Sequence, residues 1–249
     1  MVLQQETSKL NGRCVLITGG TTGIGREIAF EIAAFGANVL IVGRDEQHLD
    51  DTLRESSRAN LTIKGVLADL STPEGIKKVF EEVDKQFNGQ LDVVINNAAL
   101  AYQSATEGNY QEWKEVVETN LLAYIACTNE AVKRMEKPKS GHIIYIGSMS
   151  ADVREQGSSV YVATKAGIQG FSESLRKEVN EKGILVTVIE PGAVDTDMQP
   201  QSTDEKKSAT EDHQMLQASD IAQAVIYALT QAERCDVVEI RLRPRLQLI

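Results

Sequence analysis

The sequence has no long hydrophobic run, because no stretch approaches the roughly 18 consecutive apolar residues that a membrane span requires. Side chains that bind metals through sulfur or imidazole are scarce and lie far apart: Cys14, Cys127, Cys235, His48, His142 and His213. No CxxC pair or other metal-ligand spacing occurs among them, so the sequence predicts no metal site. An odd number of separated cysteines on apolar segments is typical of reduced, buried thiols and favours a cytoplasmic protein.

Positive charge is also in short supply. The chain has 26 Lys and Arg against 36 Asp and Glu, which gives a formal net charge of -10. This balance argues against a nucleic acid or an anionic membrane as partner, since both bind clustered positive charge. The first residues, MVLQQETSKLNGR, form a polar lead-in without the apolar core of a signal peptide. We therefore expect a small-molecule ligand, and any phosphate on it must be bound by local groups.

Short β-branched runs alternate with amphipathic stretches along the chain, with no internal repeat and no low-complexity linker. The runs predict strands at 14–18, 38–43, 61–67, 91–96, 142–147, 184–190 and 237–242. The amphipathic stretches predict helices near 24–35, 45–58, 73–87, 109–136, 158–182 and 219–230. Several strands are apolar at consecutive positions, as in parallel strands covered on both faces. The sequence therefore predicts a single α/β domain over 1–249, a Rossmann-type doubly wound parallel sheet of about seven strands with helices on both faces.

One long segment, residues 195–218, is polar and has no clear periodicity. A loop of that length in a compact domain is either a lid over a site or partly disordered. It follows the sixth predicted strand, and ligands of such sheets bind beyond the carboxyl ends of the strands. We therefore expect residues 195–218 to form a substrate lid.

A glycine-rich turn, TGGTTGIG, joins the first predicted strand to the first helix. Its spacing is G-x-x-x-G-x-G through Gly19, Gly23 and Gly25, which differs from the G-x-G-x-x-G fingerprint. Glycines at such a turn let backbone amides approach a phosphate, and the helix N-terminus favours an anion. The alternative is a tight connection without a ligand, and the position of the turn at the start of a βαβ unit disfavours it.

With this turn the chain resembles the short-chain dehydrogenase/reductase family, whose cofactor motif is T-G-x-x-x-G-x-G. The resemblance covers nearly the whole chain, because further family motifs follow in the expected order: ADL with Asp69, NNAA at 96–99, Asn120, Ser148, Tyr161, Lys165, and PGAVDT at 191–196. Each motif alone is weak, but together they are specific. The resemblance implies reversible hydride transfer between a nicotinamide cofactor and a carbonyl or secondary alcohol, without a metal.

The catalytic prediction starts from Tyr161 and Lys165, which are one helical turn apart. A tyrosine with its ordinary pKa of about 10 is a poor acid near neutrality, and a nearby ammonium would lower that pKa. The family resemblance implies that Ser148 stabilises the substrate oxygen and that Lys165 binds the ribose hydroxyls of the nicotinamide. It also implies that Asn120 binds a water molecule that relays protons. Taken alone, Ser148 could cap a turn and Asn120 could be an ordinary helix residue. Tyr110 and Lys114 have the same spacing, but without such companions they predict a solvated helix face.

The resemblance also implies a set of cofactor contacts. They comprise Gly19, Thr21, Thr22, Gly23, Ile24, Gly25, Arg44, Asp69, Leu70, Asn97, Ala98, Ala99, Ile146, Tyr161, Lys165, Pro191, Gly192, Val194 and Thr196. One departure is visible, because the usual N-N-A-G ends here in Ala99. A methyl group there would be costly only if Ala99 had to take a positive φ.

Arg44 decides the predicted cofactor. NAD-binding folds place a carboxylate at the end of the second strand, whereas this chain has Gly43 there and Arg44 next. A guanidinium can bind a 2′-phosphate through charge-assisted hydrogen bonds, so the sequence favours NADP(H). The alternative is a surface arginine paired with Asp45 or Glu46, and these acids keep NAD(H) open.

The substrate is the least determined feature of the sequence. The tail DVVEIRLRPRLQ is similar to that of NADP-dependent 3-hydroxy acid and serine dehydrogenases within the family. This similarity suggests a 3-hydroxy acid or small ketone. A 3-oxoacyl thioester, a secondary metabolite and a non-catalytic NADP sensor stay open. Arg154 could meet a substrate carboxylate or form a surface ion pair. The apolar content of helices 109–136 and 158–182, with the family habit, suggests a homo-oligomer, a tetramer or dimer.

Overall fold

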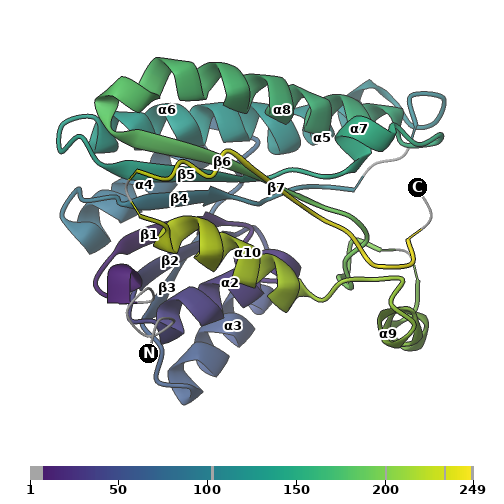
Figure 1. The fold of residues 1–249 in the computed structure, drawn as a ribbon, viewed down its shortest axis with the longest axis horizontal. Helices are drawn as coiled ribbons and strands as arrows, with labels where there is room; N and C mark the ends of the chain where they lie inside the picture. The colour runs from purple at the N-terminus through teal and green to yellow at the C-terminus, as the bar shows by residue number, and fades with distance from the viewer. Residues whose placement is uncertain (1–7, 102–103, 200, 233, 248–249) are drawn as a thin grey trace.

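The computed structural model describes residues 8–101, 104–199, 201–232 and 234–247. Seven parallel strands form one sheet in the order β3-β2-β1-β4-β5-β6-β7 (Figure 1). Their bounds are β1 Cys14–Thr18, β2 Asn38–Gly43, β3 Ile63–Leu67, β4 Val93–Asn96, β5 Gly141–Ile146, β6 Ile184–Pro191 and β7 Glu239–Leu242. This architecture confirms the predicted doubly wound fold. Each strand begins and ends within two residues of the predicted positions.

Helices cover both faces of the sheet, so that the inner strands are buried on both sides. One layer contains α4 Pro73–Phe87, α5 Tyr110–Val117, α6 Ala123–Met135 and α8 Ser159–Val179. The other contains α2 Gly23–Ala34, α3 Glu46–Arg58 and α10 Ala218–Thr230. Alternate residues of β1 belong to the two cores, Leu16 to the first and Val15 and Ile17 to the second. The apolar runs in the sequence are therefore explained by two-sided burial.

Three details differ from the sequence prediction. The segment 195–218 is not irregular throughout, because it contains helix α9, Thr203–Glu211, whose start is capped by a reciprocal pair between Ser202 and Glu205. A short helix, α7 Ser150–Val153, follows β5. The helix predicted over 109–136 is interrupted by a π-turn, η2 Glu118–Leu122. Short 3-10 turns, η1 Ser8–Leu10 and η3 Asn180–Lys182, complete the elements, and no helix of the described residues is long and apolar enough to cross a membrane.

The carboxyl ends of all the strands lie at one edge of the sheet, because every neighbouring pair is parallel. The strand order reverses between β1 and β4, and a crevice forms at such a point in doubly wound sheets. The glycine turn follows β1, Asn97 follows β4, Ser148 follows β5 and Gly192 follows β6. The fold therefore brings the predicted motifs, which are distant in sequence, to the same edge.

Candidate active site

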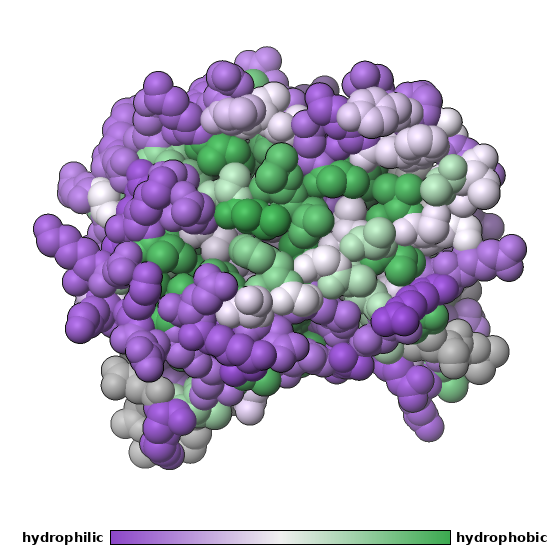
Figure 2. Space-filling view, turned by 90° about the horizontal axis from the view of Figure 1, so that it is seen from above, coloured by the Kyte–Doolittle hydropathy of each residue, from purple (hydrophilic) through white to green (hydrophobic). Residues whose placement is uncertain are grey.

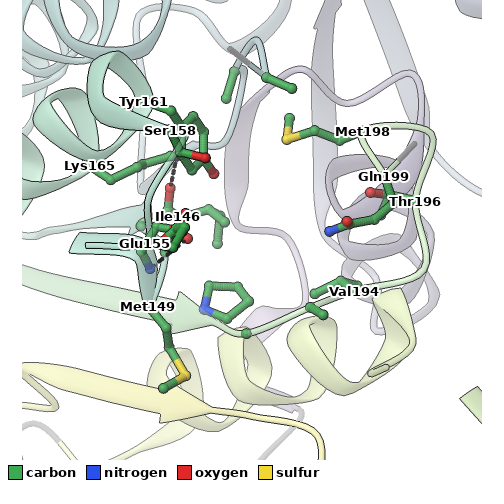
Figure 3. Close-up of a pocket in the computed structure, with 18 of the residues that line it drawn as sticks. Ile146, Met149, Glu155, Ser158, Tyr161, Lys165, Val194, Thr196, Met198 and Gln199 are labelled. Atoms are coloured by element: carbon green, nitrogen blue, oxygen red, sulfur yellow. Dashed lines mark hydrogen bonds between the residues drawn. The ribbon is translucent and has the colours of Figure 1, made fainter. Parts of the chain in front are cut away.

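A cavity of about 990 Å³ opens at this edge of the sheet (Figure 3). Its lining includes most of the predicted nicotinamide pocket and catalytic residues: Ile24, Asn97, Ala99, Ile146, Ser148, Tyr161, Lys165, Pro191, Gly192, Val194 and Thr196. The structure thus gathers side chains from four strand ends and from α8 around one space. The cavity is large enough for part of a dinucleotide together with a small substrate.

The glycine turn has the conformation that a phosphate site requires. Gly19 and Gly23 have φ of 63° and 51°, a backbone conformation that residues with a side chain rarely adopt. A Cβ at Gly25 would lie 2.2 Å from the carbonyl oxygen of Gly19, so only glycine lets the helix start so close to the strand. Thr22 is the N-cap of α2 but its side chain makes no capping hydrogen bond. The first amides of α2 are therefore not occupied by a side-chain cap, and the turn fits a dinucleotide phosphate.

The segment after β4 is tied directly to the glycine turn. The hydroxyl of Thr18 accepts hydrogen bonds from the amides of Asn97 (2.9 Å) and Ala98 (3.1 Å). The Asn97 amide group in turn donates to the carbonyls of Thr18 (3.1 Å) and Gly19 (3.0 Å). Ala99 does not have a positive φ, so the methyl group that replaces the usual glycine hydrogen costs no backbone strain. The departure from N-N-A-G is thus compatible with the predicted role.

Ser148 is oriented by its own turn and contacts Tyr161. Its Oγ accepts a hydrogen bond from the amide of Ser150 at 3.1 Å, which leaves the hydroxyl proton free to be donated. A hydrogen bond from Ser148 to the Tyr161 phenol lowers the pKa of that phenol. The serine therefore both caps a turn, as one reading of the sequence suggested, and reaches the predicted acid. A carbonyl oxygen placed between these hydroxyls would accept two hydrogen bonds.

Lys165 is buried at the wall of the cavity, and its ammonium is held by the backbone. Nζ donates to the carbonyl oxygen of Ile146 at 2.8 Å and lies 5.6 Å from the ring centroid of Tyr161. Burial lowers the pKa of Lys165 to about 8, and the charge of Glu190 partly opposes this effect. The lysine is thus a cation at neutral pH that approaches its titration point in the weakly basic range.

The sequence predicted that Lys165 would lower the pKa of Tyr161, and the structure shows a different balance. Burial raises the pKa of Tyr161, the hydrogen bond from Ser148 opposes that rise, and the charge of Glu155 adds to it. The ammonium of Lys165 is directed at the Ile146 carbonyl, and its presence does not reverse this rise. In the protein alone, Tyr161 is therefore a protonated phenol, ready to donate.

Asn120 lies in the π-turn and is fully buried. Its Nδ2 donates to the carbonyl of Leu100 at 2.8 Å, and its Oδ1 accepts from the amide of Leu100 at 2.7 Å. This pair fastens the segment after β4, which lines the cavity, to the middle of a helix. The side chain is thus engaged in positioning backbone, and a water contact through it stays a prediction. π-turns are frequent at functional sites, and this one places Asn120 against Leu100, which lies between the cavity-lining residues Ala99 and Ala101.

The predicted adenosine side of the site is partly committed to local structure. The Asp69 carboxylate accepts from the amide and the hydroxyl of Ser71 at 2.9 and 2.8 Å, which is the turn-forming role that the sequence also allowed. The Leu70 side chain is buried in the core, so a cofactor contact there falls to its backbone. Thr21 is buried as well. A Cβ at Gly43 would lie 2.4 Å from Cγ2 of Thr21, so the two residues are in close contact.

Arg44 is exposed and forms an ion pair with Glu115 of α5, with Nη1 and Oε1 2.8 Å apart. Asp45 is instead the N-cap of α3 and accepts from the amide of His48 at 2.8 Å. The local pairing of Arg44 with Asp45 or Glu46, which the sequence offered as an alternative, is therefore not the one present. An exposed ion pair is worth little, so Glu115 does not prevent Arg44 from binding a phosphate.

The loop after β6 is held from the lid side by a lysine that the sequence reading missed. Lys206 of α9 is buried, and its Nζ donates to the carbonyl of Thr196 at 2.9 Å. The same ammonium lies 3.4 Å from the carboxylate of Asp195 and 3.8 Å from that of Asp197. A Cβ at Gly23 would lie 3.2 Å from Thr196, so the loop lies directly against the glycine turn. Helix α9 therefore positions one wall of the cavity.

The rest of the cavity lining includes residues that lie outside the family motifs. They are Ala101, Glu107, Gly108, Glu112, Met149, Ser150, Val153, Glu155, Ser158, Met198, Gln199 and Gln247. Gln247 comes from the C-terminal tail, and its Oε1 accepts from the amide of Ala193 at 3.1 Å. Nothing in the local sequence indicates that this tail crosses to the loop after β6. Met198 and Gln199 belong to the expected lid, and Figure 3 shows both beside the cavity.

Comparisons with known proteins agree with this geometry. Residues 13–207 match the family model described as short chain dehydrogenase. An uncharacterized oxidoreductase of Staphylococcus epidermidis is 34% identical over 95% of this chain and 99% of its own length. The 3-oxoacyl-(acyl-carrier-protein) reductase of Escherichia coli (strain K12) is 34% identical over 79% of this chain and 80% of its own length.

Two solved structures are similar over almost the whole chain. A single-residue variant of actinorhodin polyketide ketoreductase with NADPH superposes with a TM-score of 0.85 at 28% identity, covering 94% of this chain and 97% of that one. A metagenomic short-chain oxidoreductase in complex with NADP gives a TM-score of 0.82 at 26% identity, covering 96% of this chain and 100% of that one.

Proposed function

Because this chain belongs to the short-chain dehydrogenase family, we propose that it is an NADP(H)-dependent oxidoreductase that interconverts a small ketone and its secondary alcohol. The observation that carries the proposal is the convergence of Ser148, Tyr161 and Lys165 on the cavity that also contains the glycine-turn residue Ile24. A protein that only sensed NADP would have no need for this hydroxyl pair and buried ammonium. The nicotinamide, when bound, supplies or accepts the hydride at the substrate carbon.

The protein's own residues handle the proton. In the reducing direction the phenol of Tyr161 donates its proton to the carbonyl oxygen, while the Ser148 hydroxyl stabilises the charge that develops on that oxygen. The raised pKa of Tyr161 keeps this proton on the phenol before the reaction. Lys165 holds its positive charge below the phenol, where it favours the phenolate that is left afterwards. In the oxidising direction each proton transfer is reversed.

Substitution of the phenol tests the chemistry. Tyr161→Phe should lower kcat for ketone reduction by at least about a hundredfold, because it removes the proton donor. Tyr110→Phe is the matched control, since Tyr110 is 70% exposed and lies outside the cavity lining. The measurement is NADPH oxidation with a panel of small ketones and 3-oxo acids, extended to thioesters. Tight NADPH binding without turnover of any compound by the wild type would favour the sensor and overturn the proposal.

The preference for NADP(H) rests on Arg44. The guanidinium is exposed at the end of β2, and Gly43 before it offers no carboxylate for ribose hydroxyls. The two similar solved structures contain NADPH and NADP, which supports the same choice here. Arg44→Ala should raise KM for NADPH far more than KM for NADH. Equal effects on both constants would overturn the assignment to NADP(H).

We also propose that the protein forms a homo-oligomer, with a second copy on the face formed by α5, α6 and α8. Figure 2 shows apolar side chains gathered across this face, and Val117, Leu122 and Ile125 are exposed on it. Nothing lies within 4 Å of a Cβ at Gly170 of α8, which leaves room for a neighbouring helix. Sedimentation velocity should give a multiple of 27.3 kDa, and Leu122→Glu should reduce it. The cytoplasmic location stays a prediction.

A further inference from the structure

We infer that Arg241 is a positioning residue of the active site, which holds the turn that contains Ser148 through the carboxylates of Glu190 and Asp152. This inference rests on the proposed reaction and concerns the same catalytic centre. Arg241 belongs to the tail DVVEIRLRPRLQ, from which a substrate class was predicted. In the structure this arginine lines a second cavity and is absent from the lining of the active site.

The turn after β5 contains the catalytic serine and is attached to β6 on both sides of that residue. The amide of Gly147, just before Ser148, donates to the carbonyl of Ile189 at 2.8 Å. The amide of Met149, just after it, donates to the carbonyl of Pro191 at 2.9 Å. The position of the serine hydroxyl therefore depends on this part of β6.

Glu190 lies between these two acceptors in β6 and directly beside the turn. A Cβ at Gly147 would lie 3.2 Å from Cγ of Glu190, so the glutamate side chain passes along the backbone next to Ser148. Its Oε1 accepts from Nε2 of Gln169 at 2.7 Å, and Gln169 lies one helical turn after Lys165 in α8. The carboxylate thus contacts both the serine turn and the helix of the catalytic lysine.

The Glu190 carboxylate needs a cation because its side chain is 0% exposed. A buried charge is costly unless an opposite charge or hydrogen bonds compensate it. Oε2 accepts no hydrogen bond among the described residues, but Nε of Arg241 lies 3.1 Å from it in an ion pair. Burial raises the pKa of Glu190, whereas the hydrogen bond from Gln169 and the charge of Arg241 oppose this rise. Arg241 is therefore the cation that compensates this carboxylate.

The register of the sheet directs Arg241 at Glu190. The two residues are opposite each other in the parallel pair of β6 and β7, and β7 is the edge strand (Figure 1). The same guanidinium contacts another carboxylate, because Nη1 lies 2.7 Å from Oδ2 of Asp152. Asp152 belongs to α7, which begins two residues after Ser148. Arg241 therefore reaches the serine turn by two routes, through the neighbouring strand and through the short helix that follows the turn.

Other arginines nearby do not make this connection. Arg241, Glu190 and Asp152 all line the second cavity, which has a volume of about 490 Å³. Arg154 and Arg176 line it as well, but within the described ranges neither forms an ion pair with those two carboxylates. Arg154, which the sequence offered as a receptor for a substrate carboxylate, is not part of the active-site lining. Among the arginines of the second cavity, Arg241 is thus the one that contacts the supports of the serine turn.

Arg241→Gln tests the inference. The variant should lower kcat for ketone reduction by about tenfold or more, because a small displacement of a catalytic group has a large effect on rate. The assay is NADPH oxidation with saturating substrates at pH 6.5, below the pKa of Lys165 of about 8, so that the lysine stays charged. Arg176→Gln is the matched control, since it removes a guanidinium from the same cavity and should leave kcat within about twofold of the wild type.

A double-variant cycle with Ser148→Ala separates positioning of the serine from a general loss of structure. If Arg241 acts through Ser148, its removal from a protein that already lacks the serine hydroxyl should cost about twofold or less. A purely structural role would cost the same factor in both backgrounds. Equal factors would overturn the inference, and so would an Arg241→Gln variant with the kcat of the wild type.

Arg241→Gln also leaves the buried Glu190 carboxylate without its cation, which destabilises the fold. The double variant Glu190→Gln with Arg241→Gln removes both charges and keeps an acceptor for Gln169. Circular dichroism melting should show that this variant is folded, and its kcat should fall in the wild-type background but not in the Ser148→Ala background. A folded double variant with the kcat of the wild type would contradict the role of Arg241.

Failure of this inference can be distinguished from failure of the proposed reaction. If the wild type reduces no carbonyl compound of the panel, the proposed reaction is wrong, and the role of Arg241 in it is wrong as well. If the wild type is active and Arg241→Gln is equally active, the reaction stands and the inferred role of Arg241 is overturned.

Discussion

The ammonium of Lys165 faces the ring of Tyr124, with Nζ 5.5 Å from the ring centroid. Tyr124 is buried in α6, two residues after the π-turn that contains Asn120. Its hydroxyl lies 3.5 Å from the carbonyl oxygen of Ile146, the same oxygen that accepts from Lys165. The lysine is thus held between a second tyrosine, a backbone carbonyl and the ring of Tyr161. No motif in the sequence marked Tyr124.

Removal of the Tyr124 ring should weaken catalysis by moving Lys165. A cation over an aromatic face is stabilised by about 1 to 2 kcal/mol when desolvated, so Tyr124→Leu should lower kcat/KM for NADPH by roughly five- to thirtyfold. Tyr124→Phe keeps the ring and should stay within about twofold. Steady-state kinetics of both variants, with circular dichroism melting to confirm folding, make the comparison. Equal losses in the two variants would mean that the hydroxyl, and not the ring, positions the lysine.

The pH dependence of NADPH use should report the titration of Lys165. Its pKa is lowered to about 8 by burial, so the ammonium is present below this value and is lost as the pH rises through it. We expect kcat/KM for NADPH to fall above about pH 8, because this parameter follows the ionisation of the free enzyme.

Glu190→Gln provides the test of that assignment. The charge of the Glu190 carboxylate raises the pKa of Lys165, so its removal should move the fall in kcat/KM to lower pH. Glu239→Gln is the matched control, since Glu239 is exposed and is not among the groups that affect Lys165. If kcat/KM of Glu190→Gln falls at the same pH as that of the wild type, another group titrates there.

Gly43 should limit any change of cofactor. A Cβ at this position would lie 2.4 Å from Cγ2 of Thr21, so Gly43→Asp has to displace the buried threonine. Overpacking of this kind costs about 1 to 3 kcal/mol, and we expect Gly43→Asp alone to lower Tm by several degrees and to weaken NADPH binding. The double variant Gly43→Asp with Thr21→Ala should recover stability and lower KM for NADH. Thr21→Ala alone serves as control. A stable single variant would contradict the packing argument.

The sheet could be predicted from the sequence because its signal is local. β1 and β2 are apolar at consecutive positions, and each is followed by an amphipathic helix with a clear start, such as the Asp45 cap of α3. Helix α9 was missed because Lys206 is its only buried residue, so its sequence has almost no apolar face. The capping pair Ser202 and Glu205 was the one available signal.

The site was predictable only where family motifs mark it. Ser148, Tyr161 and Lys165 meet at the cavity as expected, whereas Gln247 and Tyr124 were not foreseen. Gln247 reaches the loop after β6 from the end of the chain, and Tyr124 faces Lys165 from another helix. Such contacts depend on how distant elements pack, and a single sequence contains no periodic signal for them. The direction of the Tyr161 pKa shift was wrong for the same reason, because it depends on burial and on Glu155.

His142 should make the fold sensitive to acid. Its side chain is buried at the start of β5, and Nε2 lies 2.7 Å from Oγ1 of Thr187. That hydroxyl already donates to the carbonyl of Val237 at 2.6 Å, so it accepts from a histidine that carries its proton on Nε2. Burial lowers the pKa of His142 from 6.5 to about 4, and Arg13 adds to the effect.

The unfolded chain therefore binds the proton at a higher pH than the folded one. Stability should fall as the pH decreases from 6.5 to about 4, with a total loss of roughly 3 kcal/mol from this group. His142→Gln retains a donor for Thr187 but does not titrate, so its free energy of unfolding should depend less on pH across this interval. Urea unfolding of wild type and variant at pH 7, 6, 5 and 4.5 measures the difference. Parallel pH profiles for the two proteins would show that the acid sensitivity comes from other groups.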